Sequence, residues 1–91
     1  MHTVSAKLTF QISHSASIKD KRQVRRSIID KVKHRFNVSI AEVDTQDAIQ
    51  TLTIGIAIVS GELFHARQSL DEIVRYMEDH VDGELVELEE K

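Results

Sequence analysis

The chain has 91 residues, of which 41% are hydrophobic and 30% are charged, and its formal net charge is −3. This composition is typical of one folded globular domain and argues against a disordered chain. The chain has no cysteine, which excludes disulfides, thiol nucleophiles and cysteine metal sites. No apolar run is long enough to span a bilayer, and the N-terminus lacks the layout of a signal peptide. We therefore expect a cytoplasmic protein with no membrane contact.

The N-terminal half of the chain predicts a strand and a helix. Residues 3–13 alternate between apolar and polar side chains, which is typical of a strand with one buried face. Ser17 is a favourable helix N-cap, and Asp20 three residues later resembles a capping box. The helix is predicted to reach about Phe36, with Asn37 ending it in a left-handed conformation.

The remainder predicts two further strands, a helix and a last strand. Residues 38–46 and 50–59 read as strands joined in a hairpin, residues 60–62 open the second helix, and residues 84–90 form the last strand. The order is β-α-β-β-α-β. It predicts an α+β, ferredoxin-like fold in one domain over residues 1–91, with two helices on one face of a four-stranded antiparallel sheet.

Charge is divided unevenly along this chain. Residues 1–36 carry nine Lys or Arg and two Asp, whereas residues 37–91 carry three Lys or Arg and thirteen Asp or Glu. Residues 17–27 alone hold five basic side chains and one acid. Such an asymmetry indicates an interaction surface that the small net charge conceals.

Helical geometry gathers most of these cations on one face of the first helix. Advancing 100° per residue places an apolar stripe of Val24, Ile28, Ile29, Val32 and Phe36 toward the core. Four cations fall together on the adjoining face, within an arc of about 60°: Lys19, Arg22, Arg26 and Lys33. We call these four residues the basic ridge. They are predicted to contact RNA phosphates with Lys21 assisting, and the alternative is an ordinary solvated helix face.

Other candidate residues give weaker signals. Arg25 lies inside the apolar arc, where we expect it to extend along the core edge, or alternatively to reach a carboxylate of the acidic half. Glu42, Asp44 and Asp47 are read as a polar strand end, with Glu42 and Asp44 on one strand face and a divalent ion or acid/base pair as the alternative. The histidines lack the spacing of a zinc helix. We therefore predict no catalytic residue, no metal and no cofactor.

The open face of the predicted sheet suggests a second type of partner. Gly55, Ala57 and Val59 present small apolar side chains on the face opposite the core, where a second sheet could approach. The sequence thus allows a homodimer through the open sheet face or an edge strand. Phe10 has the phase of the buried residues, so that face has no aromatic platform for stacking bases.

The chain resembles the YlxP-like family of small bacterial proteins over essentially its full length. The matching residues are Ser17-Ile18-Lys19, Lys21-Arg22, Val24, Phe36-Asn37-Val38-Ser39, Ala41-Glu42-Val43, Gln46-Asp47, Gln50, Gly55-Ile56-Ala57 and Val59-Ser60. The resemblance implies a ferredoxin-like fold and genes that lie among those for transcription and translation. The chain departs from the family pattern at Arg25, usually apolar, and at Ile49, often tryptophan.

Together these observations predict a non-enzymatic accessory protein that binds ribosomal RNA or the ribosome through the basic ridge and Lys21. The alternative is a homo-oligomeric protein-interaction module without a role in nucleic-acid binding.

Overall fold

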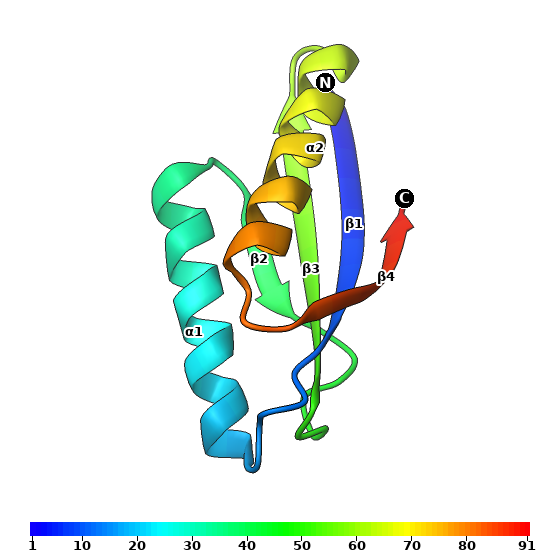
Figure 1. Cartoon of the computed structure of the whole chain (residues 1–91). Coiled ribbons are helices and arrows are strands. Elements are labelled where there is room, and N and C mark those ends of the chain that lie inside the picture. The colour runs from blue at the N-terminus through cyan, green and yellow to red at the C-terminus, as the bar shows by residue number, and fades with distance from the viewer.

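The computed structural model describes all 91 residues and contains six elements in the predicted order (Figure 1). They are β1 (His2–Gln11), α1 (Ile18–Arg35), β2 (Ser39–Glu42), β3 (Thr51–Ser60), α2 (Leu63–His80) and β4 (Glu84–Glu90). The strands form one sheet in the order β2-β3-β1-β4, with every neighbouring pair antiparallel. This topology confirms the predicted α+β, ferredoxin-like fold.

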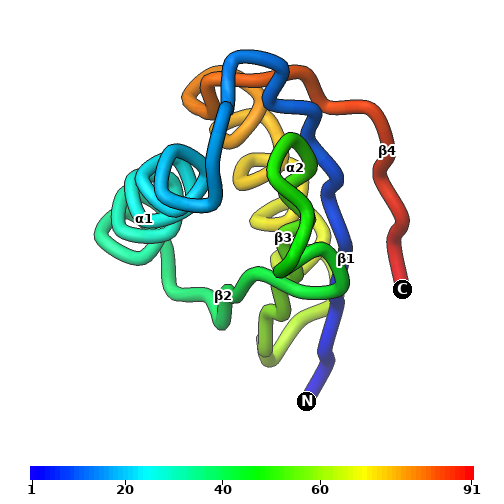
Figure 2. The backbone as a smooth tube through the Cα atoms, turned by 90° about the horizontal axis from the view of Figure 1, so that it is seen from below, coloured from blue at the N-terminus to red at the C-terminus, as the bar shows by residue number.

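The two helices cover different parts of the sheet. α2 packs over β1 and β3 at the centre, whereas α1 contacts the edge strand β2 and α2 (Figures 1 and 2). Seen along the strands in Figure 2, α1 and β4 lie at opposite sides of the molecule. Neither helix has an apolar stretch long enough to cross a membrane.

The core forms where the inward faces of β1 and β3 meet α2. Leu8 and Phe10 of β1 pair with Ile54 and Leu52 of β3, and all four side chains are fully buried. α2 adds five buried apolar residues: Ala66, Leu70, Ile73, Val74 and Met77. The strict alternation of the strand residues thus gives one apolar face, because successive side chains point to opposite sides of a sheet.

α1 begins as predicted but ends differently. The Ser17 hydroxyl accepts a hydrogen bond from the backbone N–H of Asp20 at 3.1 Å, and the Asp20 carboxylate accepts one from the N–H of Ala16 at 3.0 Å. The predicted left-handed Asn37 is wrong, because only Asp44 among the non-glycine residues has a positive φ. Phe36 instead takes an extended conformation, with φ −126°, and leads directly toward β2.

The strand predicted over residues 38–46 is shorter in the structure, because the chain turns away after Glu42. Asp44 has a φ of 63°, and the Thr45 N–H donates to the carbonyl of Val43 at 2.6 Å, which closes a tight three-residue turn.

The backbone also approaches β1 closely at Gly83, between α2 and β4. A Cβ atom there would lie 2.7 Å from the backbone oxygen of Gln11, so only glycine fits without movement.

Candidate functional site

The basic ridge is exposed on α1 and free of internal partners. Lys19, Arg22, Arg26 and Lys33 are all solvent-exposed, and none takes part in any of the seven ion pairs of the structure. α1 as a whole carries eight Lys or Arg against two Asp. The ridge cations can therefore meet an external anion without breaking an existing contact.

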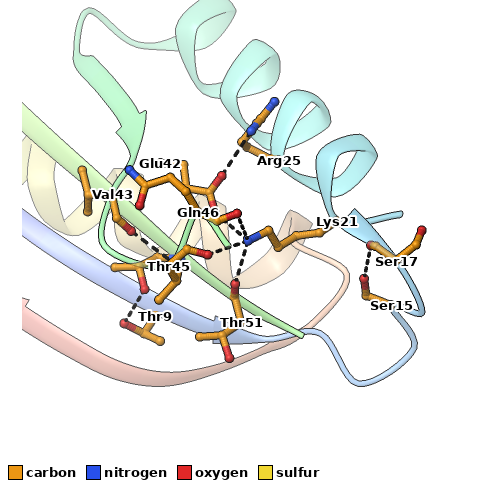
Figure 3. A network of polar contacts seen from close by, with 11 residues as sticks. Thr9, Ser15, Ser17, Lys21, Arg25, Glu42, Val43, Thr45, Gln46 and Thr51 are labelled. Atoms are coloured by element: carbon orange, nitrogen blue, oxygen red, sulfur yellow. Dashed lines mark hydrogen bonds and ion pairs between the residues drawn. The ribbon is translucent and has the colours of Figure 1, made fainter. Parts of the chain in front are cut away.

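Lys21 belongs to a different structure, a buried ion cluster of Lys21, Glu42 and Arg25 (Figure 3). The Lys21 ammonium donates hydrogen bonds to the backbone oxygens of Thr45 at 2.6 Å, and of Gln46 and Thr51 at 3.3 Å each. Its Nζ also lies 2.9 Å from Oε2 of Glu42. The residue is only 1% exposed, so the cluster satisfies a fully buried charge.

Glu42 occupies the centre of the cluster, with its side chain 4% exposed. Oε1 accepts a hydrogen bond from Nη1 of Arg25 at 3.2 Å. Oε2 lies 2.9 Å from Nζ of Lys21, and the ammonium is its only close partner. The Lys21–Glu42 ion pair is thus shielded from water, which strengthens the attraction between the two charges.

Two predictions about α1 are wrong for this reason. Lys21 cannot assist the basic ridge at a phosphate, because its ammonium is buried against the β2–β3 connection. For Arg25 the preferred expectation of extension along the core edge is wrong and the alternative is confirmed, because its guanidinium reaches the carboxylate of Glu42. The cluster therefore attaches the N-terminal half of α1, which carries three of the four ridge cations, to β2 and the loop after it.

The position of Lys21 is visible in the sequence. Lys21, Arg25, Ile28 and Val32 recur at i, i+4, i+7 and i+11, the spacing of one buried helix face. The structure buries Lys21, Ile28 and Val32 as the only fully buried residues of α1. This periodicity places Lys21 on the buried face of α1 and not on the basic ridge.

The three carboxylates near the end of β2 do not gather. Glu42 points into the cluster, Asp47 is exposed, and Asp44 accepts a hydrogen bond from Lys7 at 2.8 Å. The expected shared strand face of Glu42 and Asp44 is wrong, because the turn at Asp44 directs its side chain to the opposite side of the sheet. No three Asp, Glu or His side chains are placed to hold a metal ion.

Lys7 and its partners lie on the open face of the sheet. The hydrogen bond to Asp44, the charge of Asp44 and then that of Glu89 raise the pKa of Lys7 above its usual 10.5. The Lys91 ammonium, 3.0 Å from Glu89, lowers the pKa of that carboxyl below 4.5 through a hydrogen bond and its charge. Both ion pairs are solvent-exposed and screened, so they orient side chains more than they stabilise the fold.

Beside Lys7, the open face carries a shallow groove of about 380 Å³. Small side chains form much of its floor: Ser5, Ser39, Ala41, Gly55 and Ala57. Further along β3, Val59 is 64% exposed. No aromatic side chain lines the groove, and Phe10 is fully buried, so this face is not a base-stacking platform.

The fold and these sites define a ferredoxin-like domain that combines an exposed basic helix with a buried ion cluster and has a shallow open sheet face. Residues 3–90 match the family described as "Protein of unknown function (DUF503)", and the chain belongs to that family. It is 34% identical over 67 residues to "Uncharacterized protein YlxP" of Bacillus subtilis (strain 168), which covers 74% of this chain and 73% of that protein. The predicted membership of the YlxP-like family is thus confirmed.

Among solved structures, the chain is similar to the "De novo designed protein Ferredog-Diesel", with a TM-score of 0.48 and 14% identity. The match covers 99% of this chain and 84% of the designed chain.

Several residues that carry the family resemblance have structural roles here. Lys21 and Glu42 form the buried ion cluster. The Gln50 side-chain amide donates to the backbone oxygens of Ser13 and Ser15, both at 3.1 Å, and fastens the β1–α1 loop to the start of β3. Part of the motif therefore maintains the fold at the end of the molecule where α1 begins.

Proposed function

We propose that this protein is a non-enzymatic, cytoplasmic accessory factor that binds RNA, in the first place ribosomal RNA or the ribosome, through the basic ridge. The observation that supports this proposal is the set of exposed, unpaired cations on one helical face of an acidic chain: Lys19, Arg22, Arg26 and Lys33.

The dimensions of the ridge suit a phosphate backbone. Lys19 and Lys33 are fourteen residues apart, which corresponds to about 21 Å along a helix. Phosphates accept charged donors with tolerant geometry, and arginine adds bidentate contacts. The acidic β4 lies on the far side of the sheet from α1, where its carboxylates are distant from a bound polyanion (Figure 2).

Binding of the purified protein to ribosomal RNA and to ribosomal subunits over a salt series tests the proposal. Four phosphate contacts predict a log–log salt slope of roughly −3. Arg22→Glu/Arg26→Glu should weaken binding and flatten the slope to about half, since two contacts are lost. The single variants Arg22→Glu and Arg67→Glu give a matched pair, because both reverse one exposed arginine but only Arg22 belongs to the ridge.

A slope near zero, or equal losses in Arg22→Glu and Arg67→Glu, would show that the ridge is not the binding surface. Absence of binding at low salt would reject the RNA function altogether.

The second candidate function is a homodimeric interaction module that uses the open sheet face. It is favoured by the uncovered groove over Gly55 and Ala57 and by the exposed Val59. Pairing through the β4 edge is less favourable, because β4 carries four glutamates and no cation, and a second β4 would bring like charges together. Sedimentation equilibrium tests the sheet-face dimer: Val59→Glu should convert a dimer to monomers, and a monomeric wild type would reject it.

A further inference from the structure

A second surface of the molecule has the chemistry of a ligand site and is separate from the ridge. Three adjoining hollows of about 350, 620 and 270 Å³ follow the line where α1 and α2 meet. Arg35 and Tyr76 line the first two, Lys31 the last two, and His80 the first and third. We call these three hollows together the α1–α2 seam.

Planar side chains are stacked along the seam. The rings of Tyr76 and His80 are nearly parallel, with 17° between their planes and 3.9 Å between their centroids. The Arg35 guanidinium carbon lies 5.1 Å from the Tyr76 centroid, and the Phe36 ring meets Tyr76 edge-on at 5.5 Å. Because His80 and Arg35 are both exposed, the stack presents planar groups to solvent.

The orientation of His80 is fixed from within α2. Its Nδ1 lies 2.8 Å from the backbone oxygen of Tyr76, which suits an Nδ1–H donor. Nε2 has no partner in the protein, and neither has the Tyr76 hydroxyl. The stacked pair is thus held in place and keeps two polar atoms available.

Most charged groups of the seam are also unpaired; the exception is Asp82 of the third hollow, which lies 3.3 Å from His14. Lys31, Arg35 and Arg75 form no ion pair, and the carboxylates of Glu72 and Asp79 form none either. This contrasts with Lys21, whose ammonium is saturated by the fold. A mixed set of free cations and free carboxylates around planar rings suits a ligand that is itself planar, anionic and edged with amino groups.

We propose that the α1–α2 seam binds an unstacked nucleotide of single-stranded RNA, a proposal that rests on the RNA-binding function. The base stacks on the exposed His80–Tyr76 pair, as bases do on aromatic side chains in single-strand recognition. Glu72 and Asp79 accept hydrogen bonds from exocyclic amino groups, a pairing that carboxylates make with cytosine N4. Lys31, Arg35 and Arg75 meet the flanking phosphates. The seam therefore prefers cytosine, adenine or guanine over uracil, which has no amino group.

The composition of the chain allows a direct test, because Tyr76 is its single tyrosine and it has no tryptophan. Oligocytidylate and oligouridylate of about 12 nucleotides, a typical single-strand site size, are titrated while tyrosine fluorescence is followed. A parallel titration of N-acetyltyrosinamide corrects for absorption by the RNA. We expect quenching by oligocytidylate, weaker quenching by oligouridylate, and none by a duplex of similar length.

Variants separate stacking from folding. Tyr76→Leu and His80→Ala should each weaken oligocytidylate binding about tenfold, as measured by anisotropy of labelled RNA. Tyr76→Phe retains the ring and should bind within about twofold of wild type. His65→Ala, an exposed histidine near the start of α2, is the matched control and should bind normally. Melting by circular dichroism verifies that each variant is folded.

RNA that binds through the ridge without quenching Tyr76, with Tyr76→Leu unaffected, would overturn the seam site and leave the ridge function intact. Equal affinity for oligocytidylate and oligouridylate would overturn the role of the carboxylates. If Arg22→Glu/Arg26→Glu has no effect while Tyr76 is quenched, the seam stands and the ridge proposal fails. Absence of any RNA binding overturns both.

Discussion

Replacing Lys21 with methionine removes one buried charge while keeping most of the unbranched side chain. Four contacts of the ammonium are lost: three backbone oxygens, of Thr45, Gln46 and Thr51, and the carboxylate of Glu42. Glu42 then remains buried with Arg25 as its single charged partner. The Glu42 carboxylate must then take up a proton, bind water or displace α1 from β2.

Removal of one partner from a buried ion pair typically costs about 3–5 kcal/mol. Arg25 stays within 3.2 Å of Glu42 and is partly exposed, so we expect a loss near the lower limit, about 3 kcal/mol. That is a large share of the ~5–15 kcal/mol by which domains are stable, and it lowers Tm by roughly 12 °C or more. α1 is especially sensitive, because Ile28 and Val32 are its only other fully buried residues.

Urea denaturation followed by far-UV circular dichroism measures this loss. Lys19→Met is the matched control: the same substitution on the same helix at an exposed position should change stability by less than about 0.5 kcal/mol. In the double variant Lys21→Met/Glu42→Gln the buried charge is gone, so the two single losses should exceed the double loss by at least about 2 kcal/mol. A Lys21→Met loss below about 1 kcal/mol, or strict additivity with Glu42→Gln, would refute the proposed coupling.

Further predictions concern the turns, the cap and the open face. Gly83→Ala should destabilise by about 1–3 kcal/mol in urea denaturation, since its Cβ would lie 2.7 Å from a β1 carbonyl oxygen, whereas Gly61→Ala meets no atom within 4 Å and should be nearly neutral. Ser17→Ala should cost about 1 kcal/mol by the same measurement, through loss of the N-cap. The Glu89 carboxyl should titrate below 4.5 by NMR and return toward that value in Lys91→Ala. Because the pKa of Glu89 is lower in the folded state than in the unfolded state, the Glu89–Lys91 ion pair contributes its small stabilisation above the unfolded pKa. This stabilisation is lost as the pH falls through the folded pKa. An unshifted titration of Glu89 would contradict the ion pair.

The sequence was sufficient for the architecture because alternation and helical periodicity report burial. Strands read from side-chain alternation at residues 3–13 and 50–59 correspond to β1 and β3 within two residues at each end. The strand expected over 38–46 ends at Glu42, because the turn at Asp44 depends on contacts with distant Lys7 and on the carbonyls that Lys21 binds. Turns of this kind have no periodic signature.

The candidate site was predictable only in part. The ridge follows from helical spacing alone, whereas the α1–α2 seam brings together Arg35 of α1 and Tyr76 of α2, which are 41 positions apart in the sequence. For Lys21, the sequence contains the correct signal together with a misleading one. Its spacing from Ile28 and Val32 marks it as buried, but the neighbouring Arg22 makes it look like part of a basic surface.

α1 lies beside the β2 edge of the sheet and β4 forms the opposite edge, so positive and negative charges are separated across a molecule of small net charge. α1 carries eight cations and two aspartates, and β4 carries four glutamates, of which Glu89 is paired with Lys7 and Lys91. Near a polyanion, this charge separation favours orientations of the protein in which α1 faces the polyanion. The net charge of −3 alone would cause repulsion. The same asymmetry should let it adhere weakly to both cation- and anion-exchange resins near neutral pH, each resin holding a different side of the protein.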